Sequence, residues 1–323
     1  MRRRCVSMGL TMFALTVGTA AVLAAPQQVT LEFKGKPGDV LKYKTGLDLR
    51  LDLVVRDRTT GEQTLALQPR LSGTVTTVQH VRDVAANGDL TIGEQIESFD
   101  LALDVADLHA RLAIKGPGDR APETIRLPHL PLQVRISKQG KPLAIEGLDK
   151  LPIPPLPGPT GGKIDISALS ADFISKFAQP LCPDKPVGVG DKWQWEITVD
   201  PLEMLEMMQV PVPAEAKQQL AQIRIPIQNT STLVGFEEAA GVECARIEAV
   251  APWRLQMPVG GREGTSLILD ESGMTKVVTL FDYAAGRKVR ETTRIEVTVT
   301  LTSGTVTRLH MTMHGDIRTE LTQ

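Results

Sequence analysis

The stretch from Leu41 to Arg56 alternates between apolar and charged residues over an unusual length. Its odd positions carry Leu41, Tyr43, Thr45, Leu47, Leu49, Leu51, Leu53 and Val55, whereas its even positions are mostly charged. Alternate residues of a strand point to opposite faces, so this pattern predicts one strand with an apolar face and a wet face. At about 3.3 Å per residue the strand spans roughly 50 Å, far longer than an ordinary strand. Long β-strands are therefore the dominant element.

The same two-residue period recurs along the chain. Asn87-Gly88 predicts a tight turn, and the strand after it changes parity between Ile96 and Phe99, which predicts a bulge near Glu97. Near the C-terminus, apolar residues alternate up to Leu301 and again from Leu309 to Met313, around a turn at 302–305. This pattern predicts a long hairpin.

A Pro/Gly-rich segment separates two such β regions. We expect an N-terminal β unit at 25–148, a connector at 149–186 with a short helix at 167–177, and a C-terminal β unit at 187–323 with a helical insertion at 201–223. The predicted fold class is mainly β: two long-stranded, curved antiparallel sheet units joined by a Pro-rich, partly helical segment.

Two short matches suggest that the β units arose by duplication. Gly38-Asp39 and Gly190-Asp191 each precede a strand that carries an aromatic residue soon after its start. The segments Ser137–Gly140 and Asp270–Gly273 each read as a polar turn between strands. Chance matches of this length remain an alternative.

The start around Phe33 to Tyr43, the middle from Lys185 to Trp193 and the late segment from Leu269 to Gly273 together resemble a family of secreted bacterial β-rich proteins. That family is classed as a domain of unknown function. The resemblance implies a secreted location and a β-rich fold, and it carries over no catalytic residues.

Residues 1–24 are typical of a secretory signal peptide. Three arginines, Arg2 to Arg4, precede a mostly apolar run that ends in small residues before Ala25. A retained membrane anchor is the alternative, but the run is short for a span and several Gly and Thr residues interrupt it. We therefore expect an extracytoplasmic protein, periplasmic or secreted, with no transmembrane segment after signal cleavage.

The composition and motifs exclude several function classes. The net charge of -2 offers no basic excess for nucleic acid, and seven Phe, three Trp and two Tyr are few for the aromatic girdles of an outer-membrane barrel. We find no catalytic motif, no metal-ligand spacing and no cofactor fingerprint, and so expect no metal and no cofactor. Cys182 and Cys244 are equally compatible with a disulfide and with two buried thiols.

The sequence therefore favours a non-enzymatic extracytoplasmic protein that binds a lipid-like or other apolar ligand in a curved β-sheet. The lining candidates are Leu47, Leu49, Leu51 and Leu53 in the first unit and Val297, Val299 and Leu301 in the second. One alternative is that these residues form a filled core, in a structural or protein-interaction component of the cell envelope. An enzyme whose site is assembled from distant residues is less favoured.

Overall fold

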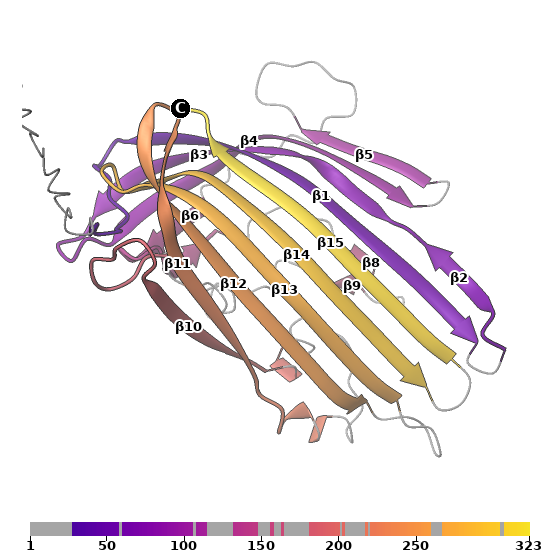
Figure 1. Ribbon diagram of the computed structural model, residues 1–323. Coiled ribbons are helices and arrows are strands. Elements are labelled where there is room, and N and C mark those ends of the chain that lie inside the picture. Colours follow the sequence, from indigo (N-terminus) through magenta and orange to yellow (C-terminus); the bar gives the residue numbers. More distant parts are fainter. Residues whose placement is uncertain are drawn as a thin grey trace, which may run out of the picture.

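The computed structural model (Figure 1) describes residues 28–57, 60–105, 108–114, 132–147, 156–157, 163–164, 181–200, 202–203, 217–218, 220–259, 267–303 and 307–323. The predicted signal peptide, the short helix at 167–177, and most of the connector and of the helical insertion lie outside these residues.

The first half of the chain contributes nine strands: β1 (Val40–Asp57), β2 (Gln63–Leu67), β3 (Arg70–Val84), β4 (Leu90–Val105), β5 (Leu108–Ile114), β6 (Leu132–Ile136), β7 (Pro142–Glu146), β8 (Leu156–Pro157) and β9 (Lys163–Ile164). The second half contributes β10 (Lys192–Val199), β11 (Ile225–Ala239), β12 (Val242–Val259), β13 (Leu267–Asp282), β14 (Arg287–Ser303) and β15 (Thr307–Leu321). The mainly β fold class is confirmed.

Thirteen of these strands form a single antiparallel sheet, in the order β10-β11-β12-β13-β14-β15-β1-β3-β4-β6-β7, with β2 beside β1 and β5 beside β4. The two expected β units are thus parts of one continuous sheet, because β15 pairs with β14 on one side and with β1 on the other. The strands lie side by side over most of their length (Figure 1).

Several local predictions are confirmed by the strand register. Thr76 lies opposite Ser98 and Thr77 opposite Ile96, which leaves Glu97 as the extra residue of a bulge in β4. The long C-terminal hairpin is formed by β14 and β15. β1 extends over 18 residues, as its alternation predicts.

The sheet contains the same strand pattern twice. We call β1, β3, β4, β6 and β7 the N-terminal repeat, and β10 to β14 the C-terminal repeat. At the start of the first strand of each repeat, Val40 pairs with His80 and Lys192 pairs with Thr232. The next residue of the second strand, Val81 or Leu233, is followed in both repeats by a bulge. The hairpin β6–β7 has a bulge after Arg135, and β13–β14 has one after Leu280.

The entries to the two repeats are also alike. The amide of Gly38 donates to the carbonyl of Val81, and the amide of Gly190 donates to that of Leu233. The Asp39 carboxylate accepts from the amide of Lys36 and that of Asp191 from the amide of Gly188, so each closes the same turn. Both glycines have φ near +90°, which favours glycine. The Gly-Asp match therefore marks equivalent positions.

The second sequence match was wrong. Ser137–Gly140 is the β6–β7 turn, but Asp270–Gly273 lies inside β13, paired on both sides. Gly273 is there because the Trp253 ring lies against it: a Cβ would come within 2.2 Å of that ring. The register makes the β13–β14 turn at 282–286 the counterpart of the 137–141 turn.

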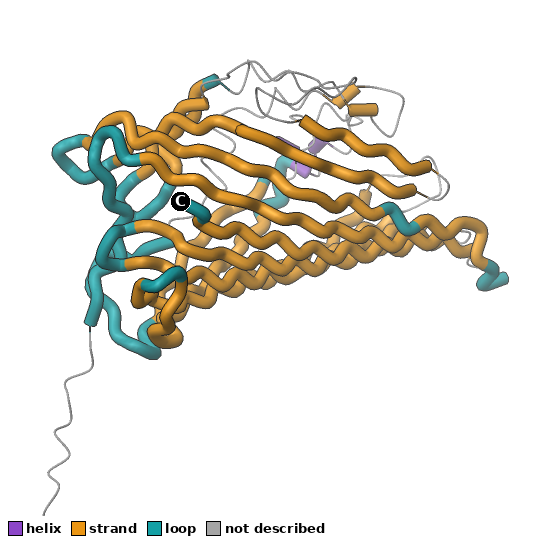
Figure 2. Tube along the Cα trace, turned by 90° about the horizontal axis from the view of Figure 1, so that it is seen from above, coloured by secondary structure: helices purple, strands orange, loops and turns teal. Residues whose placement is uncertain are grey.

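One end of the sheet curls into a closed trough. Along the sheet, the β6–β7 turn and the β13–β14 turn are five strand spacings apart, or about 24 Å. Two adjacent residues nevertheless bridge them, because the amide of Phe33 donates to the carbonyl of Lys138 in one turn and the amide of Lys34 donates to the carbonyl of Gly286 in the other. Described loops gather at this end (Figure 2). We call it the closed end.

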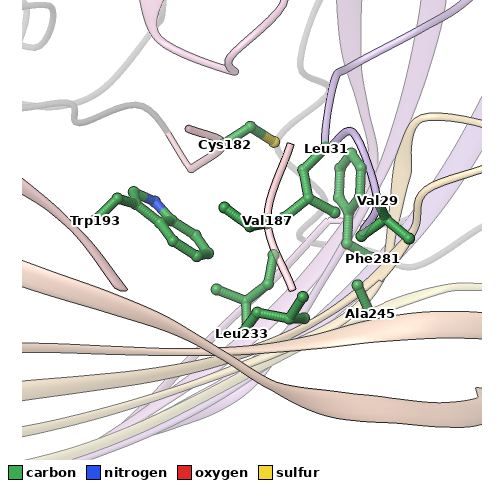
Figure 3. Close-up of a cluster of buried hydrophobic side chains, with 9 residues drawn as sticks. Val29, Leu31, Cys182, Val187, Trp193, Leu233, Ala245 and Phe281 are labelled. Atoms are coloured by element: carbon green, nitrogen blue, oxygen red, sulfur yellow. The ribbon is translucent and has the colours of Figure 1, made fainter. Parts of the chain in front are cut away.

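A second segment ties the two lateral limits of the sheet together at this end. Trp193 of β10 donates to the carbonyl of Leu181, while the amides of Leu181 and Cys182 donate to Gln139 in the β6–β7 turn. The buried core lies here, where two other segments pack against the C-terminal repeat (Figure 3), and consists of Val29, Leu31, Cys182, Val187, Trp193, Leu233, Ala245, Ile247 and Phe281. The face of the sheet that it covers is called the inner face.

Candidate functional site

The register brings the two groups of predicted lining residues onto one face. Met313 of β15 lies between Leu51 of β1 and Val297 of β14, and directly opposite residues of antiparallel strands share a face. In the next row, Met311 lies between Leu53 and Val299. The residues predicted to line two separate units therefore belong to a single surface on the inner face.

The other predicted lining residues continue this surface. Leu49 lies opposite Gly315 and Leu47 opposite Ile317, and the register places Leu301 opposite Leu309. Leu71 extends the Leu49 row on the β3 side and Leu67 the Leu53 row on β2. We call these residues the apolar patch: Leu47, Leu49, Leu51, Leu53, Val55, Leu67, Leu71, Ile295, Val297, Val299, Leu309, Met311, Met313 and Ile317. The side chain of Leu301, also predicted to line the site, lies outside the described residues.

The patch is large, and most of it lies beyond the closed end. Leu47, Leu49, Leu51 and Leu53 are each only half-buried, whereas Val297 is buried. From Leu47 to Val55 the patch is about 26 Å long, and from β14 to β3 it is about 14 Å wide, or roughly 370 Å². A contiguous apolar area of about this size is in the range of the largest patch on a typical monomer, and such patches are often binding sites.

The opposite, outer face carries ion pairs. Arg70 binds the Asp48 carboxylate through two hydrogen bonds of 2.9 Å, and Arg50 binds the same group, which lowers the pKa of Asp48 to about 2. Arg294 pairs with Asp316 at 3.2 Å on neighbouring strands. One face of the sheet is therefore wet and the other apolar, as the alternation predicts.

A cavity of about 330 Å³ lies at the closed end of the inner face, within the N-terminal repeat. Its walls come from β1, β3, β4 and β6, from Phe33 and Lys34, from Gly140 and Gly286 in the two turns, from the start of β14 and from Thr319 of β15. Gly140 and Gly286 allow the segment around Phe33 to approach, since a Cβ at either would meet Phe33 or the Lys34 backbone within 2.6 Å. The cavity is thus built by close backbone contacts.

Two of the ionisable side chains that face this cavity are Tyr43, which is buried, and Glu94, which is half-buried. Burial raises the pKa of Glu94, against the opposing effects of a hydrogen bond from Gln79 and of the Lys288 charge. Burial also raises the pKa of Tyr43 to about 12, and its hydroxyl donates to the carbonyl of Lys288 at 3.2 Å. Tyr43 and Glu94 are therefore held in an environment that disfavours their charged forms.

Replacing Glu94 with glutamine should increase the free energy of unfolding at pH 7.5 and change it little at pH 4. The pKa of Glu94 is higher in the folded state than in the unfolded state, where it is about 4.5. The contribution of Glu94 to the free energy of unfolding is therefore complete below the unfolded-state pKa and is lost as pH rises through the folded-state pKa. Urea unfolding at the two pH values measures this.

Glu320→Gln is the control of opposite sign. A hydrogen bond from Arg318 lowers the pKa of Glu320, so its stabilisation is present at neutral pH and is lost as pH falls through the folded pKa. Glu320→Gln should therefore destabilise at pH 7.5. Equal responses of the two variants to pH would contradict the burial of Glu94.

Sequence reasoning missed the cavity residues. Glu94 interrupts an apolar series at even positions, Leu90, Ile92 and Ile96, and a charged residue at such a position was the available signal. Arg287 and Lys288 come from the start of β14, far along the chain, and their approach depends on the curl of the sheet, which no local pattern encodes.

The two cysteines are free, buried thiols in separate clusters, so the structure has the second of the two alternatives and not the disulfide. Cys182 belongs to the core of the closed end, and Cys244 packs with Leu280 and Val289. Burial raises the pKa of Cys182 to about 12, which makes it a poor nucleophile. Within the described residues no cluster of three or more His, Cys, Asp or Glu is arranged to hold a metal ion.

None of the helices that the described residues form has the length and apolar character needed to cross a membrane. No family model and no curated protein matches the chain. Solved structures similar to it include lipovitellin, in a study of lipid–protein interactions, with 11% identity, a TM-score of 0.38, and coverage of 89% of this chain and 25% of lipovitellin. The chain thus spans about a quarter of that protein's length.

Two Pseudomonas aeruginosa proteins are also similar. OpdQ has 8% identity and a TM-score of 0.21, over 88% of this chain and 100% of OpdQ. OpdL has 10% identity and a TM-score of 0.21, over 88% of this chain and 99% of OpdL. All three TM-scores are too low to bear on function.

Proposed function

We propose that this protein is an extracytoplasmic, non-enzymatic binding protein that holds a lipid-like molecule in its trough. The observation that supports it is the apolar patch: two series of aliphatic residues from opposite halves of the chain meet on the inner face of one sheet. The closed end buries a core, but the leucines of β1 stay half-buried outside it.

The chemistry of the patch favours acyl chains over ring-shaped ligands. Its side chains are Leu, Val, Ile and Met, with no aromatic residue among those defined above. Methionine side chains adapt their shape, and Met311 and Met313 lie in the middle strand of the patch. A broad, adaptable aliphatic surface suits a flexible hydrocarbon, whose burial contributes about 0.8 kcal/mol per CH₂.

The first experiment is extraction of the natively purified protein into organic solvent, followed by mass spectrometry. We expect a lipid in stoichiometric amount from protein isolated from an envelope fraction. Protein that carries no extractable lipid, and that takes up none from vesicles of mixed phospholipid, would contradict the proposal and favour an envelope protein that binds a protein partner.

Met313→Asp should reduce the bound lipid at least tenfold without unfolding the sheet. Met313 lies at the centre of the patch between Leu51 and Val297, and a carboxylate there would have to be desolvated by the bound chain. The measurement is lipid per protein after extraction, with circular dichroism as the test of folding.

His314→Asp is the matched control. His314 is the next residue of β15, it is exposed, and it faces the wet side between Arg50 and Glu296. The same new charge one residue away should leave lipid content unchanged. Equal losses in the two variants would show that charge on β15, and not the apolar patch, controls binding.

A further inference from the structure

At the closed end, equivalent positions of the two repeats have different surroundings. In the C-terminal repeat this place is filled by large side chains, whereas the equivalent positions of the N-terminal repeat line the cavity. The register gives the pairs Trp193 and Leu41, Trp195 and Tyr43, Leu233 and Val81, Ile247 and Ile92, and Phe281 and Ile136. In these pairs, except for the two isoleucines, the cavity residue is the smaller, whereas Leu90, Gln79 and Glu94 are larger than their counterparts Ala245, Ser231 and Ala249.

The cavity side is also more polar. Gln79 and Glu94, which lie opposite each other, take the positions of Ser231 and Ala249 in the C-terminal repeat. Ala249 is a buried apolar residue, so its counterpart Glu94 is an ionisable group at a core position. A scaffold that packs a dry core in one repeat keeps an open, polar space in the other, which points to a bound group and not to imperfect packing.

The cavity wall carries more cations than carboxylates. Lys34, Arg287 and Lys288 line it, against Glu94 as the carboxylate among the described lining residues. Two acids outside the lining compensate in part: Glu291 lies 3.2 Å from Lys288 Nζ, and Asp282 lies 3.6 Å from Arg287 Nε.

This compensation leaves donors available. The Asp282 distance is too long for a hydrogen bond, and the buried Arg287 Nε has no partner among the described groups. Lys34 Nζ donates to the carbonyl of Tyr283, an uncharged acceptor. A buried donor without a partner is costly, so an acceptor in the cavity would be bound favourably.

The cavity and the apolar patch are continuous along β1. Leu41, Tyr43 and Thr45 line the cavity, and the next residues on the same face, Leu47 and Leu49, begin the patch. A molecule with its polar end beside Tyr43 would therefore lay a chain along β1 toward the open end of the trough.

From this arrangement we infer that the cavity binds the anionic headgroup, a carboxylate or a phosphate, of a single-chain amphiphile whose hydrocarbon chain lies on the apolar patch. The inference rests on the proposed function and names the ligand class. With about 330 Å³, the cavity has room for a headgroup and the first carbons of the chain, while the rest lies on the sheet.

The test compares three ligands with the same twelve-carbon chain: dodecanoate, dodecyl phosphate and dodecanol. Equilibrium dialysis below the micelle concentration should give affinities for at least one of the two anions about tenfold or more above that for the alcohol, since a charge-assisted hydrogen bond is replaced by a neutral one. The comparison of the two anions separates carboxylate from phosphate recognition.

Two variants locate the effect in the cavity. Lys288→Gln should weaken anion binding about tenfold and leave dodecanol binding unchanged. Leu41→Trp places in the cavity the residue that the C-terminal repeat carries at the same position, so the fold should accept it while the headgroup is displaced. Lys276→Gln is the control, because Lys276 is also ion-paired, with Glu248 at 3.3 Å, but on the outer face.

The outcomes separate the two proposals. Equal binding of alcohol and anions, or loss of anion binding with Lys276→Gln as large as with Lys288→Gln, would overturn the headgroup site and leave the lipid-binding trough intact. Failure of all three ligands to bind would contradict the trough itself. If Leu41→Trp does not fold, as judged by circular dichroism, Lys288→Gln alone decides.

Discussion

Phe281→Ala should lower the free energy of unfolding by about 3–5 kcal/mol, the cost of removing a large aromatic side chain from a core. Phe281 has 0% of its surface exposed and is the largest of the fully buried side chains. Its ring packs edge-on against Phe33 with centroids 5.2 Å apart, so the substitution also removes one of the contacts that hold the Phe33 segment to the C-terminal repeat. Denaturant unfolding measures the change.

Ile136→Ala is the matched comparison, because Ile136 occupies the equivalent position in the N-terminal repeat but borders the cavity. Its truncation enlarges an existing space and should cost about 2 kcal/mol or less, at or below the low end for core truncations. A cost as large as that of Phe281→Ala would mean that the N-terminal repeat is packed as tightly as the C-terminal one, against the presence of the cavity.

Gly286→Ala should destabilise by about 2–4 kcal/mol, through two separate causes. The backbone at Gly286 has a φ of +70°, which costs a residue with a Cβ about 1–2 kcal/mol. In addition, the new Cβ would lie 2.5 Å from the Lys34 nitrogen and 2.6 Å from the Glu32 oxygen, so the backbone must move and the Lys34–Gly286 hydrogen bond is lost.

Gly241→Ala separates these causes. Gly241 has a φ of +76° in the β11–β12 turn, but nothing lies within 4 Å of a Cβ built there. It should therefore show only the conformational cost, about 1–2 kcal/mol. Hydrogen exchange of the Lys34 amide gives a second readout: it should become faster in Gly286→Ala and stay unchanged in Gly241→Ala. Equal stability losses in the two variants would contradict the close approach at Gly286.

Local features of this fold were predictable because they determine the two-residue alternation of apolar and polar residues in the sequence. The alternation from Leu41 to Val55 fixes which residues face inward, and the change of parity between Ile96 and Phe99 reveals the bulge at Glu97. Since the side-chain period of a strand is two, an extra residue leaves a visible trace in the pattern.

The pairing of distant strands was not predictable in this way. Every long strand here has an apolar and a polar face, so the pattern does not tell which of them lies beside β1. Two units were expected because the connector separates two β regions, but β15 pairs with β1 from Tyr43 to Asp57 and merges them. The sequence therefore predicted two separate groups of lining residues, and it is the pairing of β15 with β1 that joins them in one apolar patch.

The turn assignment failed for a related reason. Gly273 in a polar context reads as a turn, whereas its role is to accommodate the Trp253 ring inside a strand. The sequence alone does not distinguish a glycine that lies under an aromatic ring from a glycine in a turn, because the difference depends on the residue on the neighbouring strand.

The seam between β15 and β1 also sets the order in which this protein is able to fold. Thr322 donates to the carbonyl of Lys42, 280 residues earlier. A chain delivered N-terminus first therefore has β3 available for one side of β1 long before β15 exists for the other. Until then β1 is a long, half-apolar edge strand, the kind of surface that aggregates with other chains. Completion of the sheet depends on contacts of very high sequence separation, which predicts slow folding and a need for protection of β1 until β15 is available.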